Sequence, residues 1–301
     1  MSQDHVGFRR VVTASRFFTL TFGGIVGVAW IVLLGDFVGQ AGPLGSALAL
    51  LVGAAAIGIV ALCYVDVANQ IPAAGGEIVI THATGSLRMT FVVGWVLCMT
   101  YMSVCVFEAI SLAWIIDMLF PGARGQVLYV AFGEPVTTGG LTWGVAATLV
   151  LCAINVFSAR ASASAQEWVT YCRIAVAGMF LWAVIVWGRA DNLDPLFAPS
   201  GPGLSHGVVA VLATAPFLYA GFNIFASVME ERSADCTPGG LRRAILLAVF
   251  AASVFYIAVI AAMSSIAPWQ STVKLECPPR PFSARRPGCR CLPRSCSASR
   301  R

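Results

Sequence analysis

The sequence predicts an all-α membrane protein, a polytopic bundle of about seven transmembrane helices. Hydrophobic residues make up 58% of the 301 residues, charged residues only 11%, and the mean hydropathy is +0.82. Soluble domains carry roughly 25% charged residues. About seven apolar stretches approach or exceed the roughly 20 helical residues that cross a hydrocarbon core. Two of these stretches, far apart in the chain, are interrupted by residues that disfavour a helix.

The predicted spans follow one another through loops that collect the charges and turn residues. They cover residues 17–34, 44–65, 89–116, 141–157, 168–187, 207–229 and 244–266. A tight turn at Gly42-Pro43 joins the first two spans, and longer loops are expected at 66–88, 117–140 and 188–206. Glycine is frequent, with 29 residues, as expected where helices pack closely in lipid.

The first span is interrupted by a glycine-rich segment, which consists of Gly23, Gly24, Ile25, Val26 and Gly27. An unpaired backbone N–H or C=O costs several kcal/mol in lipid, so a broken helix is expected only where it lines a polar cavity. The break would free N–H groups at the start of the following half-helix, where the helix dipole favours a ligand's carboxylate. The alternative is that these glycines serve only helix packing.

The sixth span is interrupted by Pro216 and Gly221. Pro216 has no N–H and would leave free carbonyls around residues 215–219. Such carbonyls can accept hydrogen bonds from an ammonium group. Aromatic rings could wall the pocket and contact a cation, unless they are ordinary core residues. The residues predicted to bind a ligand here are Phe217, Tyr219, Gly221, Phe222 and Asn223. A matched pair of broken helices is typical of the binding site of a secondary transporter.

Two ionisable residues fall within predicted spans. Glu108 lies in the third span, where a charge costs at least about 2.5 kcal/mol, so it is a candidate for binding a proton or a cationic group. A protonated or paired packing carboxyl is the alternative. Arg173 lies in the fifth span and stays charged at any biological pH, so it could fill a cation site. It could instead extend toward the cytoplasmic surface.

The basic residues predict the orientation in the plasma membrane. With the N-terminus in the cytoplasm, the cytoplasmic segments hold eight arginines and the outside loops before the tail hold two. Arg9, Arg10 and Arg16 precede the first span, which is too long for a signal peptide and lacks a small-x-small cleavage site. These arginines also oppose a seven-helix receptor, which would have its N-terminus outside. A retinal protein would need a lysine in the last span, but the single lysine, Lys274, lies beyond it.

Residues 271–301 form a tail of different character. From Cys277 onward the chain holds seven arginines, five prolines, four cysteines and no acidic residue. This tail is expected to be disordered and to be an aberrant end of the chain. Its charge of +7 leaves 5 − 7 = −2 for residues 1–276, so the basic pI indicates no nucleic acid partner.

The segment from Tyr64 to Glu77, with Asp66, Pro72 and the Gly75-Gly76 pair, resembles the acidic–x5–Pro–x2–Gly-Gly signature of amino acid–polyamine–organocation permeases. The glycine-rich first break, the sixth span followed by Glu230-Glu231, and Asn155, Gln166 and a basic residue in the fifth span fit the same family. The resemblance covers roughly residues 10–270. It implies the LeuT-like fold of two inverted five-helix repeats with helices 1 and 6 broken.

The resemblance also implies a domain organisation. Residues 1–16 would be the cytoplasmic N-terminus, 17–187 the first repeat, 188–206 an extracellular loop, and 207–270 the first two helices of the second repeat. The chain would thus be a C-terminally truncated permease. The implied function is secondary active transport of an amino acid or polyamine by alternating access, with a proton or a counter-substrate as second partner. The alternative is a transport-incompetent fragment.

The sequence gives little support for an enzyme or a primary pump. It shows no nucleotide-binding loop, no metal motif and no nucleophile–base arrangement, so no catalytic residues, cofactor or metal are predicted. His82 and His206 are isolated from each other and are not expected to bind a metal. The expected partners are a small-molecule amino acid or polyamine substrate and the lipid bilayer.

Overall fold

The protein is described by a computed structural model that covers residues 12–271, except 121, 123–124, 132–133, 158 and 199–203. The predicted tail from 272 onward and the first 11 residues lie outside this range. The helices are α1 (Ala14–Ile25), α2 (Trp30–Gln70), α3 (Glu77–Thr84), α4 (Leu87–Leu119), α5 (Thr138–Phe157), α6 (Ala159–Trp187), α7 (Leu204–Leu218) and α8 (Pro238–Ile266). Two 3-10 helices, η2 (Ala190–Leu193) and η3 (Phe222–Glu231), complete them.

The helical prediction is confirmed, because each predicted span lies on helices of the structure. In the described part of the chain, five helices are long and apolar enough to cross a membrane. They are Leu33–Gln70, Leu87–Ile116, Gln166–Trp187, His206–Glu231 and Pro238–Ile266, and Thr138–Ile154 is a shorter apolar helix. The predicted first span is made of two pieces, α1 and the beginning of α2, with the break between them.

The connection predicted at Gly42-Pro43 is a sharp kink inside α2, between the end of the first predicted span and the second. Gly42 has a φ of 77°, which strains any residue with a side chain. A Cβ there would also lie 2.6 Å from the backbone N of Ala198. Pro43 has no N–H and so cannot continue the ladder of helical hydrogen bonds. The kink therefore needs both residue types.

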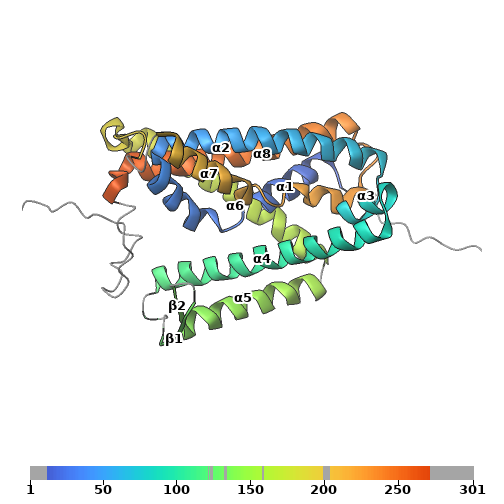
Figure 1. Ribbon diagram of the computed structural model, residues 1–301, viewed down its shortest axis with the longest axis horizontal. Coiled ribbons are helices and arrows are strands. Elements are labelled where there is room, and N and C mark those ends of the chain that lie inside the picture. Colours follow the sequence, from blue (N-terminus) through green and yellow to red (C-terminus); the bar gives the residue numbers. More distant parts are fainter. Residues whose placement is uncertain are drawn as a thin grey trace, which may run out of the picture.

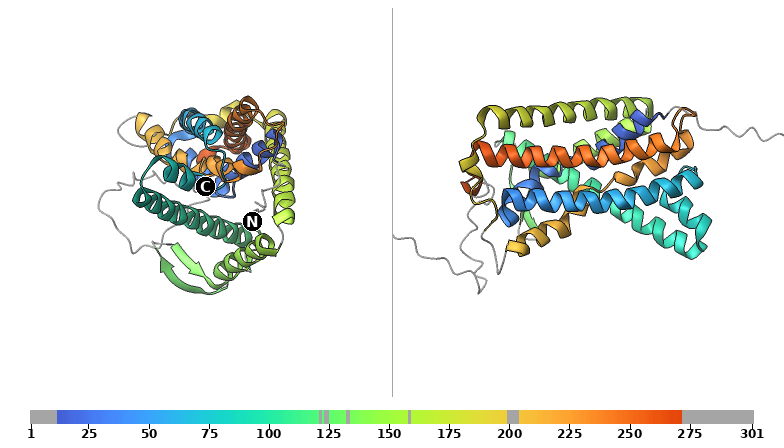
Figure 2. Two further views of the ribbon diagram at one scale, coloured as in Figure 1. Left: turned by 90° about the vertical axis from the view of Figure 1, so that its right-hand side faces the viewer. Right: turned by 90° about the horizontal axis from the view of Figure 1, so that it is seen from above.

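The core lies where α7 and α8 each pack along α2, with α1 and α6 against α8. Figure 1 shows these helices gathered in one half of the molecule, and Figure 2 shows α2, α6 and α8 running side by side when seen from above. The largest fully buried side chains include Tyr219, Tyr256, Phe17, Phe22 and Phe225. Most of them come from the two broken helices and from α8.

Helices α4 and α5 form the other half of the molecule, and they lie against each other (Figure 1). Many of their large apolar side chains are exposed, such as Phe91, Trp95 and Leu149. Such an exposed apolar surface is unfavourable in water but expected where lipid is the solvent.

A small β-hairpin is the one departure from an all-α fold in the described residues. Strands β1 (Val127–Ala131) and β2 (Glu134–Thr137) pair antiparallel inside the stretch that we expected to be a plain loop, 117–140. Residues with high strand propensity, such as Tyr129 and Val136, are placed opposite each other. The loop at 66–88 is likewise shorter than predicted, because α2 runs on to Gln70 and α3 occupies its second half.

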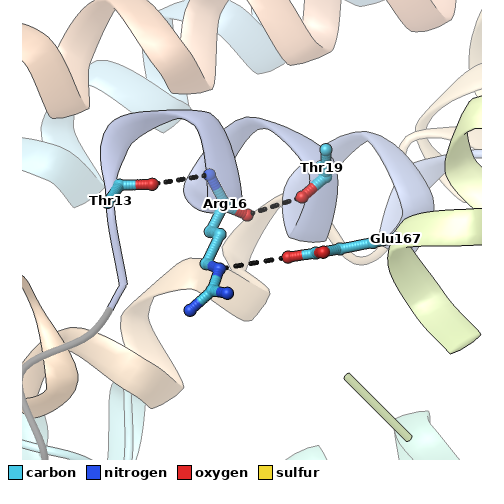
Figure 3. Close-up of polar contacts among 4 residues, drawn as sticks. All are labelled: Thr13, Arg16, Thr19 and Glu167. Atoms are coloured by element: carbon cyan, nitrogen blue, oxygen red, sulfur yellow. Dashed lines mark hydrogen bonds and ion pairs between the residues drawn. The ribbon is translucent and has the colours of Figure 1, made fainter. Parts of the chain in front are cut away.

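Polar contacts join α1 to α6 near the N-terminal end of α1 (Figure 3). Nε of Arg16 lies 3.1 Å from Oε1 of Glu167. Thr13 caps α1 by accepting a hydrogen bond from the N–H of Arg16, and the Thr19 hydroxyl donates to the Arg16 carbonyl over 3.1 Å. The ion pair is half exposed, so its expected contribution to stability is only about 0–1 kcal/mol.

The chain before α1 is paired with the loop that follows η3. The N–H of Val12 donates to the carbonyl of Glu231, and the N–H of Ser233 donates to the carbonyl of Val12, both over 2.9 Å. Arg232 in the same loop donates to Oδ1 of Asn69 over 2.6 Å. The start of the first broken helix and the end of the second are therefore tied together.

Candidate functional site

Both predicted helix interruptions are present. The first begins later than the predicted segment 23–27, whereas the second lies within the predicted interval from Pro216 to Gly221. Gly23, Gly24 and Ile25 still belong to α1, because the N–H of Val26 keeps its helical bond to Phe22 over 2.8 Å. The first break therefore spans residues 26–29. Pro216 lies inside α7, and the second break spans residues 219–221, ahead of η3.

The last turn of α1, just before the first break, touches the second break through glycine backbone. Gly221 has a φ of 95°, and a Cβ added there would lie 2.4 Å from the carbonyl oxygen of Gly24. A Cβ added at Gly24 would lie 3.0 Å from the carbonyl oxygen of Gly221. The backbones of Gly24 and Gly221 therefore lie so close together that a side chain at either position would collide with the other residue. The segments around Gly24 and Gly221, nearly 200 residues apart in the sequence, therefore lie in direct contact.

A cavity of about 30 Å³ lies between the breaks. Its lining comes from four elements: the first broken helix, α4, the second broken helix and α8. The lining residues are Gly24, Ile25, Gly27, Ala29, Trp30, Val104, Phe107, Glu108, Phe217, Leu218, Ala220 and Tyr256. A space of this size holds about two waters, so the site must widen to admit a larger ligand.

Glu108 reaches from α4 into the first break. Its Oε2 accepts a hydrogen bond from the N–H of Val28 over 2.6 Å. A Cβ at Gly27 would lie 2.0 Å from Oε1 of Glu108, so the carboxylate rests directly on the glycine. A backbone N–H freed by the break is therefore occupied by a carboxylate of the protein itself. Such charge-assisted bonds are short and strong.

Tyr256 of α8 connects the ends of both broken helices. Its hydroxyl lies 3.0 Å from the carbonyl oxygen of Ile25 and 2.9 Å from that of Leu218, which are the last residues of α1 and α7. The side chain is buried, with 1% exposure. Since one hydroxyl carries one proton, it donates to one of the two carbonyls at a time. Tyr256 was not predicted, although it is the sole tyrosine of the span 244–266.

Replacing Tyr256 by Phe is expected to lower the free energy of unfolding by about 1–3 kcal/mol, because two buried carbonyls lose their donor. Chemical or thermal unfolding of the protein in detergent micelles measures this change. Tyr171→Phe is the matched control, since Tyr171 is 54% exposed on α6 and the same hydroxyl loss there should change little. Equal stability of the two variants would contradict a role for Tyr256 in joining the breaks.

Arg173 of α6 contacts the first broken helix from outside the cavity. Its Nη1 donates to the carbonyl oxygen of Gly23 over 2.9 Å. Thr170 and Gln166, about one and two turns earlier on α6, face the same glycine, where a Cβ would lie 2.1 Å from Nε2 of Gln166. Gly23 therefore serves the packing of α1 on α6, and Arg173 places a fixed positive charge at a carbonyl near the break.

Several residues predicted to bind a ligand do not line the cavity. The hydroxyl of Tyr219 lies 3.1 Å from the carbonyl oxygen of Leu50 and 3.0 Å from Oγ of Ser253, so it points away from the cavity into the core. The ring of Phe222 packs on Tyr64 with centroids 5.4 Å apart. Four further residues that were predicted to bind a ligand are also absent from the cavity lining: Gly23, Val26, Gly221 and Asn223.

Asn223 instead belongs to a polar cluster beside the cavity. Its Nδ2 donates to the carboxylate of Glu77 on α3 and, over 3.2 Å, to the hydroxyl of Tyr101 on α4. These bonds hold the start of η3 against α3 and α4. Of the predicted site, the cavity lining retains Gly24, Ile25, Gly27, Glu108 and Phe217. Phe107 and Tyr256 are additions that sequence patterns alone did not indicate.

Comparison with known proteins reveals clear relatives. The family model described as "Amino acid permease" matches residues 13–280. The branched-chain amino acid permease BcaP of Bacillus subtilis is 27% identical over 266 residues, covering 86% of this chain and 55% of the relative. The methylthioribose transporter of the same organism is 23% identical, covering 86% and 56%. Human cationic amino acid transporter 4 is 26% identical, covering 90% and 43%. The chain spans about half the length of these relatives.

Proposed function

Because this chain belongs to the amino acid permease family, we propose that it takes part in secondary active transport of an amino acid or polyamine. The observation that carries the proposal is the contact between two broken helices around one cavity. Broken helices in lipid are tolerated where they serve a polar site, and paired breaks are typical of secondary transporters. The protein is a membrane permease rather than an enzyme.

The cavity supplies complementary groups for a small charged ligand. Carbonyl oxygens at Ile25 and Leu218 face it and can accept hydrogen bonds from an ammonium group. The rings of Phe107 and Phe217, whose centroids lie 5.3 Å apart, form an apolar wall that can also contact a cation. The N–H at the first break can receive a carboxylate, which at present is that of Glu108.

The transport step in this proposal is alternating access. The inner half of each broken helix would move away from its outer half, with the break as hinge. The contacts of Arg16 with Glu167 and of Val12 with Ser233 would hold the inner halves in place between such movements. An ion gradient or a counter-substrate would supply the driving force, since a permease of this kind needs no nucleotide.

Two charged residues are proposed to couple the movement to an ion or proton. Arg173 would act as a permanent cation at the Gly23 carbonyl, because a guanidinium does not release its proton at biological pH. Glu108 would bind a proton or the cationic group of the substrate. Both residues contact the first broken helix from different neighbours, α6 and α4, so a change at either one acts on the same break.

We also propose the topology that the arginine distribution predicts. The N-terminus would lie in the cytoplasm, residues 17–187 would form the first repeat, 188–206 an outer loop, and 207–270 the first two helices of the second repeat. The protein would lie in the plasma membrane. Asp235→Cys, at an exposed position in the loop after η3, tests the inner placement of that loop in a background whose other cysteines are replaced by serine. An impermeant thiol reagent should label this variant only after the membrane is permeabilised.

Uptake into proteoliposomes tests the proposed function. The 301-residue chain is reconstituted, and radiolabelled leucine, arginine and putrescine are offered separately. Saturable uptake of at least one, abolished by an excess of the unlabelled compound, is the expected result. Folded protein that neither binds nor takes up any amino acid or amine would contradict the proposal.

A second candidate is that the chain binds a substrate without moving it. The observation that favours it is the coverage, about half the length of the relatives. In that case the purified protein binds one of the three compounds, whereas no saturable uptake occurs. Measuring binding and uptake on the same preparation separates the two candidates.

A further inference from the structure

We infer that Glu108 stands in the place of a ligand's carboxylate, so that the site selects an organic amine over the α-amino acid with the same side chain. This inference rests on the proposed function and names its substrate class. It makes Glu108 a residue that determines specificity. Three features of the cavity support it: the position of the carboxylate, the acceptors that remain, and the charge of the lining.

The first feature is the position of the Glu108 carboxylate. A ligand carboxylate would seek an N–H at the start of the half-helix that begins at Trp30, where the helix dipole is positive. Oε2 of Glu108 already accepts from the N–H of Val28 over 2.6 Å, and Oε1 fills the space over Gly27. A ligand carboxylate would have to displace this group. An amine without a carboxylate would leave the bond in place.

The second feature is a pair of backbone carbonyl acceptors that belong to residues lining the cavity. The carbonyl oxygens of Ile25 and Leu218 share the single proton of the Tyr256 hydroxyl. An ammonium group carries three donors and a positive charge, so it can serve both carbonyls at once, which the hydroxyl cannot. Glu108, which lines the same cavity, then provides the opposite charge. An amine can therefore serve both carbonyls while the bond between Glu108 and Val28 stays in place.

The third feature is the charge of the lining. Among the described residues that line the cavity, Glu108 is the only one with an acidic or basic side chain. The guanidinium of Arg173 also influences this region, but it donates to the Gly23 carbonyl and lies outside the lining. Two carboxylates competing for one N–H repel each other. The rings of Phe107 and Phe217 attract a cation and offer nothing to an anion.

The experiment compares an amine with its parent amino acid. Agmatine and arginine share a side chain, as do isoamylamine and leucine, and the members of each pair differ by the carboxylate. Calorimetric binding to the full chain in nanodiscs gives the affinity ratio of amine to amino acid for each pair. The expected ratio is about tenfold or more in favour of the amine. Glu108→Gln should lower it by about tenfold or more, because the neutral amide no longer balances an ammonium and leaves the break open to a carboxylate.

Asp191→Asn is the matched control, since Asp191 lies on η2 in an exposed position and the substitution removes the same charge. It should leave the ratio unchanged. A thermal unfolding curve for each variant shows that the compared proteins are folded, and Glu108→Asp, which keeps the charge, should retain the preference for the amine if the first variant is unstable. Stronger binding of the amino acids by the original chain would overturn the inference alone. If no member of either pair binds, the proposed function is overturned as well.

Discussion

Gly27→Val is expected to abolish ligand binding while leaving membrane insertion intact, with an affinity loss of about a hundredfold or more, or about 3 kcal/mol. A Cβ at this position would lie 2.0 Å from Oε1 of Glu108 and 2.8 Å from its Cδ, so the carboxylate would have to leave the break. The valine methyl groups would occupy the small space between the breaks. Binding of the preferred ligand by the purified variant, measured by calorimetry, gives the loss directly.

Gly178→Val is the matched control for this substitution. Gly178 lies within α6, and a Cβ there meets no described atom within 4 Å. The same residue change should therefore alter neither binding nor folding by much. If Gly27→Val inserts, folds and binds with unchanged affinity, the first break is not part of the binding site.

The substitution Gly221→Ala is expected to destabilise the fold by about 3 kcal/mol or more. A non-glycine residue in the left-handed region costs about 1–3 kcal/mol, and Gly221 has a φ of 95°. In addition, the new Cβ would lie 2.4 Å from the carbonyl oxygen of Gly24 and 2.8 Å from its carbonyl carbon. These are backbone atoms, which cannot rotate away as the end of a side chain can. The backbone at residue 221 would therefore have to move away from Gly24, and the contact between the two broken helices would be lost. Unfolding in detergent micelles followed by circular dichroism measures the loss.

Gly58→Ala introduces the same side chain as Gly221→Ala but is expected to have the opposite effect on stability. Gly58 lies in the long second part of α2, where a Cβ would lie 3.9 Å from Cδ2 of Leu246, an ordinary contact. A glycine in the interior of a helix is less favourable than alanine by roughly 0.5–1 kcal/mol, so this variant should be slightly more stable. If both variants shifted the stability equally, the contact of Gly24 with Gly221 would have no energetic importance.

The helices could be predicted from the sequence because lipid imposes strong local requirements. A span needs a run of apolar residues long enough to cross the hydrocarbon, and its backbone must bond to itself, so each span is visible in its own residues. The kink at Gly42 was also visible, since glycine next to proline disfavours a continuous helix. The hairpin of β1 and β2 was not, because its pairing depends on register between two short segments.

Only part of the binding site could be predicted from the sequence, because side-chain directions depend on contacts between helices. The interruptions themselves are local, so Gly27 and Gly221 could be identified as unusual positions within apolar runs. Which way a side chain points depends on neighbouring helices. Tyr219 was expected to face a ligand, yet it donates its hydrogen bond within the core, whereas Tyr256 joins both breaks from α8. A search for tyrosines within apolar spans would have included Tyr256, together with Tyr64, Tyr101 and Tyr171.

Glu108 illustrates the same division between local and distant information. Its presence inside a span made it a candidate functional carboxyl, with a protonated or paired packing carboxyl as the alternative, because a charge in lipid must be compensated. Its bond to the N–H of Val28 joins residues 80 positions apart and could not be inferred from either segment. That bond is the reason why the carboxylate site expected at the first break is already occupied.

The sequence by itself determined the class of protein, the helices and the existence of two breaks, because these follow from hydrophobicity and backbone bonding within single segments. Only the tertiary structure decided that the breaks touch at Gly24 and Gly221, and that Glu108 and Tyr256 satisfy the backbone groups exposed there. The physical reason is that an unpaired peptide group in lipid takes whichever partner packing brings within about 3 Å. The identity of that partner is a property of the assembled bundle.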